Sequence, residues 1–288
     1  MRFHLPLLTA LALLFATTIY AQSPAPFPLI HPDSVGLSGD SLAQMEAHFH
    51  GLVDARQLAG IQTAVLRNGQ LAHFDSYGYA NIATQEPLND QHLFRIFSMT
   101  KPIVSVALMQ LYEQGKFRLE DPLHLYIPAF KDLQRYEDST LVPVQQPIRI
   151  IDLLRHTSGF SYGRSQNPLV DQHYATAQLN TATTNEAFVL KISQLPLLFE
   201  PGTDWQYGLS TNICGYLVEV LSGQSLDHYL EDHVLGPLGM TDTHFQIPAE
   251  KIGRFTVGYG WQEGTGLSVV EAASDNRYTR PVTLFNGG

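Results

Sequence analysis

A serine and a lysine three residues apart occur in the sequence Ser98-Met99-Thr100-Lys101. On a helix, this spacing places the two side chains on one face of the same turn. A serine hydroxyl becomes a good nucleophile only when a base takes its proton. Lys101 can be that base only in its neutral form, whereas the reference pKa of a lysine is about 10.4. The spacing therefore indicates a serine nucleophile, provided that its surroundings disfavour the ammonium.

The residues after Ser98 predict a helix from about Met99 to Gln114, apolar nearly all round and hence buried, and ended by Gly115. With Ser98 as N-cap, Pro102 lies among the first residues, whose N–H groups lack helical partners, so proline removes no hydrogen bond. Burial and the positive end of the helix dipole both disfavour a charged Lys101. By itself the tetrapeptide is weak evidence, because an ordinary helix cap beside a surface lysine has the same sequence.

Two other serines stand in sequences that resemble catalytic motifs. Gly159-Phe160-Ser161-Tyr162-Gly163 fits the nucleophile elbow, which needs a strand before the serine and a helix after it. A helix-like stretch precedes Ser161 and a polar loop follows, so the context disfavours it. Ser274-Asp275-Asn276 spells the SDN motif of class A β-lactamases, but it follows Ser98 by 274 − 98 = 176 residues, which is too far for that class. We interpret it as a coincidence.

The composition supports one large globular domain or two modest ones. The 288 residues are 44% hydrophobic, enough for a sizeable core, and 27 acidic against 17 basic side chains give a net charge of −10. This charge argues against nucleic acid as a partner. The single cysteine, Cys214, excludes a disulfide framework and a cysteine-based zinc site, and the histidines form no HExxH motif. We expect no metal and no organic cofactor.

The N-terminus predicts a signal peptide over residues 1–21. Arg2 precedes an apolar stretch from Leu5 to Ala16, and Ala21 offers a small residue for cleavage. The stretch is too short to span a bilayer, and no second long one follows, so we expect no stable membrane span. The prediction is an exported protein, periplasmic or secreted; a retained N-terminal anchor is the alternative.

The periodicity predicts an α+β arrangement. Asp40 is expected to cap a helix, and Ile61–Arg67 and Leu71–Tyr77 to form a hairpin around Asn68-Gly69, a pair that favours tight turns. Later segments are predicted as proline-punctuated loops over 116–206, short helices near 148–154, 186–194, 212–221 and 226–234, and a glycine-rich, weakly strand-like end from Gly253.

Four segments together resemble the serine β-lactamase and penicillin-recognising superfamily, nearest to class C β-lactamases and family VIII carboxylesterases. They are Phe94-Arg95-Ile96-Phe97-Ser98-Met99-Thr100-Lys101, Leu153-Leu154-Arg155-His156-Thr157-Ser158-Gly159, Phe199-Glu200-Pro201-Gly202 with Tyr207, and Leu235-Gly236-Pro237-Leu238-Gly239-Met240-Thr241-Asp242. The resemblance implies an antiparallel sheet flanked by helices plus a helical domain, with an α/β part over 22–100 and a mainly helical part over about 101–250.

The resemblance also implies roles for three residues. Ser98 is similar to the acylated nucleophile, Lys101 to its partner, and Tyr207 to the tyrosine that carries protons between Ser98 and the leaving group. Such a tyrosine needs cationic neighbours that lower its pKa from about 10. His156 resembles a structural histidine of this superfamily. Trp205 and Tyr162 are candidates for the pocket wall, and a buried core tyrosine is the alternative for Tyr207.

Two departures from the family pattern matter. β-Lactamases of this type have Tyr-x-Asn, whereas Leu209 follows Tyr207 at the Asn position, which weakens recognition of an amide and favours esters. The third family motif, Lys-Thr-Gly or His-x-Gly, and the strand that carries one oxyanion-hole N–H, are not found before Gly288. We therefore expect a domain, 22–288, that is incomplete at its C-terminus, and that would fold poorly and be nearly inactive if expressed alone.

The sequence thus predicts an exported serine hydrolase that forms and hydrolyses an acyl-enzyme on small-molecule esters or amides, with carboxylic esters favoured. One alternative is a β-lactamase or D-Ala-D-Ala carboxypeptidase. Another is a non-catalytic relative that binds cell-wall fragments or a protein, although Ser98, Lys101 and Tyr207 are all present. The oligomeric state stays open.

Overall fold

The computed structural model of the chain describes residues 27–282 and 284, so the predicted signal peptide lies outside the described residues. The chain divides into two compact units, Met1–Tyr79 with Pro87–Asp90, and Ala80–Glu86 with Gln91–Gly288. The helices are α1 (Gly39–Asp54), α2 (Thr100–Glu113), α3 (Ile150–Leu154), α4 (Pro168–Thr176), α5 (Asn185–Ile192), α6 (Ser210–Ser222) and α7 (Leu226–Leu230). The strands are β1 (Gly60–Arg67), β2 (Gln70–Asn81), β3 (Glu86–Pro87), β4 (Gln134–Glu137), β5 (Thr140–Pro143), β6 (Gly258–Gln262) and β7 (Gly266–Glu271).

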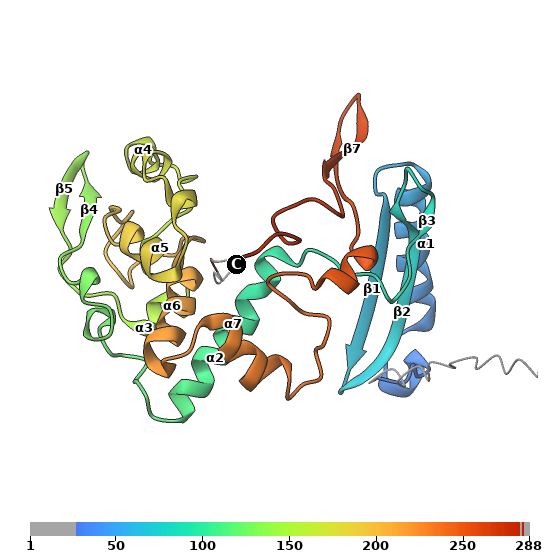
Figure 1. Cartoon of the computed structure of the whole chain (residues 1–288), viewed down its shortest axis with the longest axis horizontal. Coiled ribbons are helices and arrows are strands. Elements are labelled where there is room, and N and C mark those ends of the chain that lie inside the picture. Colours follow the sequence, from blue (N-terminus) through green and yellow to red (C-terminus); the bar gives the residue numbers. More distant parts are fainter. Residues whose placement is uncertain (1–26, 283, 285–288) are drawn as a thin grey trace, which may run out of the picture. The chain divides into compact units, whose positions relative to one another are not determined.

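The first unit places helix α1 beside strands β1 and β2 (Figure 1). The hairpin predicted around Asn68-Gly69 is confirmed: Arg67 pairs with Gln70, and φ is 54° at Asn68 and 73° at Gly69. Both residues of the turn therefore have the positive φ that a tight turn of this kind requires. The order of strands in the sheet is β1-β2-β3.

Helix α1 begins two residues earlier than predicted. Its N-cap is Ser38, whose hydroxyl accepts the Ser41 N–H at 3.2 Å, so the prediction that Asp40 caps the helix is wrong. Asp40 lies instead inside the first turn, where its negative charge still interacts favourably with the helix dipole. His50 of α1 stacks on Tyr77 of β2 with ring centroids 3.8 Å apart, and this contact helps to join helix and sheet.

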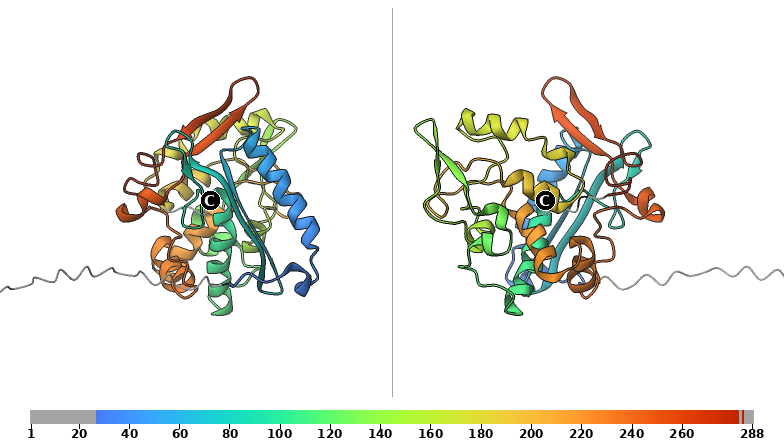
Figure 2. Two further views of the ribbon diagram at one scale, coloured as in Figure 1. Left: turned by 90° about the vertical axis from the view of Figure 1, so that its right-hand side faces the viewer. Right: turned by 60° about the vertical axis from the view of Figure 1, so that its left-hand side comes forward.

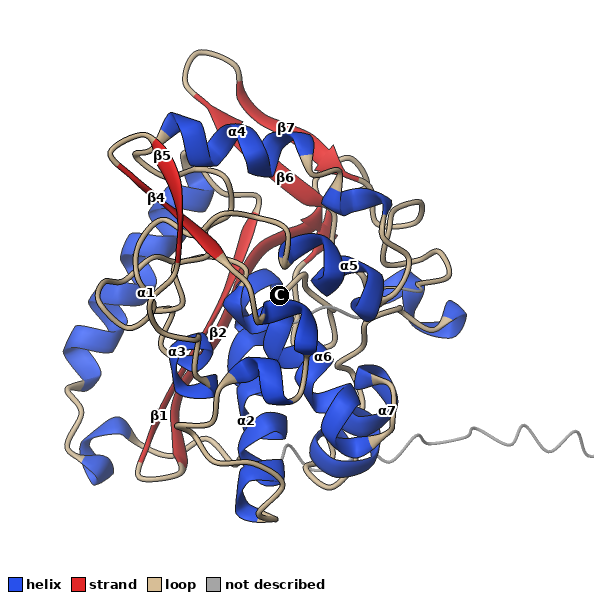
Figure 3. Cartoon of the chain, turned by 90° about the vertical axis from the view of Figure 1, so that its left-hand side faces the viewer, coloured by secondary structure: helices blue, strands red, loops and turns tan. Residues whose placement is uncertain are grey.

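The second unit is built on helix α2, which packs against α6 and α7, while α3 and α5 also pack on α6 (Figure 3). The contacts bury Val104, Ala107, Leu108 and Leu111 of α2 almost completely. The prediction that this apolar helix is buried is wrong in one respect, because Val106 on another face is 48% exposed. Helix α2 is therefore buried on one face only, and that face includes Lys101.

Two further hairpins belong to the second unit. Strands β4 and β5 pair in a stretch that the sequence predicted only as loops, and β6 and β7 pair antiparallel near the end of the chain. The β6–β7 hairpin extends away from helices α2 and α6 (Figure 2). Together with the helices, these sheets confirm the predicted mixed α+β class. The single Cys214 is buried in α6, and burial raises the pKa of its thiol to about 12, so it stays protonated and unreactive.

No helix among residues 27–282 is both long and apolar enough to cross a membrane. Cys214 is the only cysteine of the sequence, so the expected lack of a disulfide framework follows from composition alone.

Candidate functional site

Ser98 lies in a tight 3₁₀ turn, Phe97–Met99, immediately before helix α2. The prediction that the Ser98 side chain caps the helix is wrong: α2 begins at Thr100 after Met99, and no side-chain cap is formed there. The residue before the serine, Phe97, has a φ of 42°, in the left-handed region that a side chain normally avoids. The turn thereby leaves the Ser98 hydroxyl at an exposed position.

Lys101 lies in the first turn of α2 and is 8% exposed. Its Nζ atom donates a hydrogen bond to Oγ of Ser98 at 3.2 Å. The predicted proximity of the serine and the lysine is therefore confirmed by the structure, although a 3₁₀ turn rather than a capped helix start brings them together. The amine is close enough to exchange a proton with the hydroxyl directly.

Tyr207 lies three residues before helix α6, with its ring centroid 5.0 Å from Nζ of Lys101. Hydrogen bonding with Ser98 is the main effect that lowers the pKa of the Tyr207 phenol below 10, and the nearby Lys101 contributes through a hydrogen bond and its charge. Partial burial opposes them. The structure thus brings all three predicted site residues together. The Tyr207 phenol also ionises more easily than that of an ordinary tyrosine.

The backbone after Tyr207 depends on a glycine. A Cβ atom at Gly208 would lie 2.3 Å from the carbonyl oxygen of Phe160 and 2.7 Å from Cα of Ser161. Such distances are far inside van der Waals contact, so only glycine allows this approach. The backbone of Gly208, two residues before α6, therefore packs directly on residues 160–161, next to Tyr207.

His156 contacts the same segment. Its carbonyl oxygen accepts the Gln206 N–H at 2.9 Å, and its Nδ1 atom accepts the Gly208 N–H at 3.3 Å. The ring centroid of His156 is 4.8 Å from that of Tyr207. Burial, followed by the positive charge of Lys101, lowers the pKa of His156 below 6.5. The sequence offered no sign of these contacts beyond the family segment in which His156 lies.

A cavity of about 1260 Å³ opens at Ser98 and Tyr207, within the second unit. Leu209 lies in its wall, as do the apolar side chains of Ile103, Phe188 and Leu230. The wall also includes Tyr162, as proposed from the sequence, whereas Trp205 is 60% exposed and contacts Tyr207 at a centroid distance of 6.4 Å. The volume exceeds the roughly 300–1,000 Å³ of ordinary small-molecule pockets.

The rival serine, Ser161, is fully buried. Its Oγ accepts the Gly163 N–H at 2.8 Å, and its own N–H donates to the Tyr174 hydroxyl at 3.2 Å. Helix α3, rather than a strand, precedes it, so the strand–turn–helix geometry of a nucleophile elbow is not formed here. Ser161 supports the turn at Gly163 instead.

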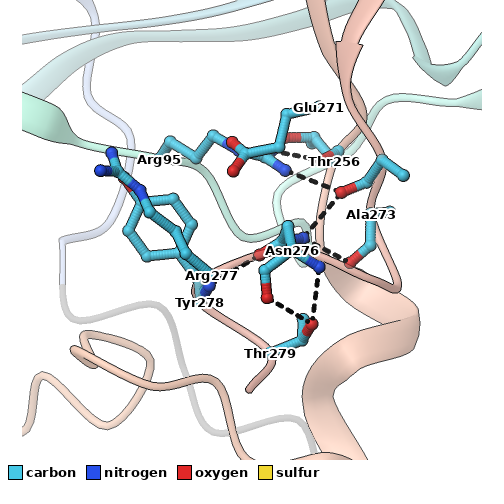
Figure 4. A network of polar contacts seen from close by, with 9 residues as sticks. Arg95, Thr256, Glu271, Ala273, Asn276, Arg277, Tyr278 and Thr279 are labelled. Carbon is cyan, nitrogen blue, oxygen red and sulfur yellow. Dashed lines mark hydrogen bonds and ion pairs between the residues drawn. The ribbon is translucent and has the colours of Figure 1, made fainter. Parts of the chain in front are cut away.

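In the Ser274-Asp275-Asn276 sequence, Asn276 makes several hydrogen bonds (Figure 4). The Asn276 side-chain amide donates to the carbonyl oxygens of Ala272 and Ala273 at 2.7 and 3.2 Å, and its Oδ1 accepts the Tyr278 N–H at 2.8 Å. Asp275 pairs with Arg280 at the surface. These contacts hold a turn and agree with the interpretation that the motif is a coincidence.

Arg95, three residues before Ser98, fastens the nucleophile segment to this turn (Figure 4). Its guanidinium pairs with Glu271, donates to the carbonyl oxygens of Thr256 and Ala272 at 2.6 and 3.0 Å, and lies 4.0 Å from the centre of the Phe255 ring. Arg95 is only 5% exposed in its side chain. The segment that leads to Ser98 is therefore held rigidly from one side.

Comparison with known proteins found a matching family and several similar proteins and structures. The model of the family described as Beta-lactamase matches residues 45–282. Esterase EstB of Burkholderia gladioli is 30% identical over 80% of this chain and 58% of its own, and monacolin J acid methylbutanoyltransferase of Aspergillus terreus is 29% identical over 73% and 53%. The unliganded structure of simvastatin synthase (LovD) from Aspergillus terreus matches with a TM-score of 0.68 and 26% identity, over 81% of this chain and 62% of that one. The chain thus spans little more than half the length of the curated relatives.

Proposed function

Because this chain belongs to the Beta-lactamase family, we propose that it is an exported serine hydrolase that acylates Ser98 and then hydrolyses the acyl-enzyme. The single observation that carries the proposal is the hydrogen bond of 3.2 Å between Lys101 Nζ and Ser98 Oγ, with Tyr207 bonded to the same serine. Similarity to an esterase and to an acyltransferase supports acyl transfer as the reaction class.

In the proposed acylation step, Lys101 and Tyr207 act as one general-base pair: the Tyr207 phenolate accepts the Ser98 proton while Oγ attacks the acyl carbon, and the adjacent Lys101 ammonium stabilises the phenolate before the transfer. The tetrahedral intermediate collapses as the bond to the leaving alkoxide breaks, and the alkoxide takes a proton from Tyr207. In deacylation, a water molecule gives its proton to the same pair and attacks the acyl group. Ser98 leaves with a proton, and the free enzyme is restored.

The cavity wall supports carboxylic esters as the substrates. Leu209, which is 5% exposed, lies in that wall beside Tyr207. A leucine neither donates nor accepts a hydrogen bond, so it cannot hold the side-chain amide of a β-lactam or of a peptidoglycan peptide. Small and medium esters are therefore the first choice, and β-lactams or D-Ala-D-Ala peptides are the second.

A second candidate is transfer of the acyl group to an alcohol in place of water. The resemblance to monacolin J acid methylbutanoyltransferase favours it, and the cavity of about 1260 Å³ is large enough to hold an acyl group together with a second molecule. The two candidates share the acyl-enzyme on Ser98 and differ only in the nucleophile that releases the acyl group.

The test uses p-nitrophenyl butyrate and nitrocefin with the protein expressed from its complete reading frame, and with S98A as the control. We expect ester turnover that S98A abolishes, and a mass increase on Ser98 after treatment with a fluorophosphonate. Addition of an alcohol acceptor separates hydrolysis from transfer by the products formed. Rapid nitrocefin cleavage without ester turnover would reverse the order of substrates, and a protein that gives no adduct on Ser98 would be a binder. An adduct on Ser161 would overturn the site.

A further inference from the structure

The two peptide N–H groups on either side of Tyr207 both donate to one residue, His156. The Gln206 N–H donates to the His156 carbonyl oxygen at 2.9 Å, and the Gly208 N–H donates to its Nδ1 atom at 3.3 Å. A third bond, from the Gly202 N–H to the Thr157 carbonyl at 2.8 Å, holds the beginning of the same segment. The backbone that carries the catalytic phenol is thus attached to residues 156–157, more than 40 positions earlier in the chain.

The bond from Gly208 fixes the protonation state of the histidine. An imidazole nitrogen accepts a hydrogen bond only when it carries no proton, so Nδ1 must be bare and the proton of the neutral ring must be on Nε2. A protonated ring has a donor at both nitrogens. Its Nδ1–H and the Gly208 N–H would then both be donors, so the hydrogen bond between them would be lost.

Lys101 and Tyr207 are the ionisable groups that bear on this ring. Lys101 reaches it electrostatically from α2 and lowers its pKa, an effect smaller than that of burial, and Tyr207 packs on it together with the neutral Trp205. Both effects keep the ring neutral at pH 7, with the acceptor available.

We propose that His156 is a positioning residue for Tyr207. The neutral Nδ1 atom of His156 holds the peptide after the tyrosine, and protonation of His156 releases that peptide and slows acyl transfer. The proposal rests on the proposed function, since it takes Tyr207 as the proton carrier. His156 itself touches neither the reacting hydroxyl nor the acyl group in this mechanism. Its effect passes entirely through the placement of Tyr207.

The backbone at this position suggests a discriminating variant. His156 has a φ of 58°, in the left-handed region, where asparagine is several-fold enriched among residues with a side chain. The Oδ1 atom of an asparagine can take the place of imidazole Nδ1 as acceptor, and it does not titrate. H156N therefore keeps both the backbone and the hydrogen bond and removes the protonation, together with the ring contacts to Tyr207 and Trp205. H156A removes the acceptor.

The first experiment compares kcat/KM for p-nitrophenyl butyrate between pH 5 and 8. We expect H156N to match the original protein at pH 8 and to exceed it increasingly as the pH falls, by up to about tenfold once His156 is protonated, the effect of one lost hydrogen bond. H156A should lose about tenfold in kcat at pH 8, with little change in KM, and should approach the original protein as His156 becomes protonated at lower pH. H173N, a matched variant of a histidine that bonds to Tyr136 instead, should follow the pH profile of the original protein. A constant ratio of H156N to the original protein across this pH range would overturn the proposal, as would equal losses in H156N and H156A.

The second experiment needs no turnover, so it separates failure of this proposal from failure of the proposed function. The amide resonance of Gly208 is followed by ¹⁵N NMR from pH 7.5 to 4.5. We expect it to move with the titration of His156 in the original protein and to stay fixed in H156N. A Gly208 resonance that does not respond to the titration of His156 would overturn the positioning role of His156, even if ester turnover is found. No turnover together with a responsive Gly208 would instead reject the function and keep the contact.

Discussion

The Nζ atom of Lys101 lies 5.0 Å from the centre of the Tyr207 ring and 5.6 Å from that of Tyr162. The amine thus sits beside two phenols, and hydrogen bonding with Ser98 lowers the pKa of Tyr207. We expect Y207F to lose about 10²–10⁴-fold in kcat, the usual contribution of a general acid–base group. Y162F, the matched variant across the amine, should lose much less.

The same pair predicts a pH dependence. Because the phenolate of Tyr207 is the base, and its pKa is lowered from 10, kcat/KM should rise with pH as the phenol ionises and level off at a pH below 10. A profile of kcat/KM from pH 6 to 10 tests this, with Y207F expected to lack the rise. A rise of the same size in Y207F would assign the titration to another group.

Leu209 offers a test of substrate class. In L209N, an amide replaces an apolar side chain in the cavity wall beside Tyr207, and it can bond to the amide of a β-lactam or a peptide. We expect the ratio of nitrocefin to p-nitrophenyl butyrate turnover to rise about tenfold, since a single good hydrogen bond has about this effect. Because Leu209 is buried, the variant should also unfold at a lower temperature. An unchanged ratio in a folded L209N would remove Leu209 from the account of specificity.

Arg95 should contribute to stability far more than an ordinary surface arginine. R95A leaves Glu271 and two backbone carbonyls without their partner in a largely buried network, and such losses amount to about 3–5 kcal/mol when the pair is fully buried. The upper part of that range is not expected, because Glu271 is 24% exposed. R280A is the matched control: its pair with Asp275 is exposed, and exposed pairs are worth about 0–1 kcal/mol. Urea unfolding of both variants measures the difference, and equal unfolding midpoints would contradict the stabilising role of Arg95.

Export is predicted from the sequence alone. We expect cell fractionation to find the protein outside the cytoplasm, and mass spectrometry of the purified protein to show a new N-terminus after Ala21, since residues 1–21 have the pattern of a cleaved signal. Retention of Met1 in a membrane fraction would favour the uncleaved anchor instead.

Local signals explain which parts of the fold were predictable. Asn68-Gly69 predicts its hairpin because both residues of this tight turn need a positive φ, which asparagine and glycine adopt readily. The turn between β4 and β5 has the same backbone, with φ of 44° at Asp138 and 67° at Ser139, but its sequence is not distinctive, and the hairpin was missed. The start of α2 was misjudged since a 3₁₀ turn and a capped helix begin with similar residues.

The site was predictable where its residues carry a motif. Ser98 and Lys101 are close in sequence, and Tyr207 follows the segment 199–202 in the family pattern. The contribution of His156 was not predictable, because its contact with Gly208 joins positions 52 apart through a single ring nitrogen. The need for glycine at 208 likewise depends on the carbonyl of Phe160, which no local pattern reveals.

The left-handed backbone of Phe97 has a consequence for engineering. A residue with a side chain is less stable in this conformation by about 1–3 kcal/mol, and glycine is not. The Phe97 ring is 60% exposed, so its own burial does little to compensate. F97G should therefore raise the unfolding temperature. It should also make the turn that positions the Ser98 hydroxyl more flexible. Thermostability and turnover are expected to move in opposite directions at this one residue.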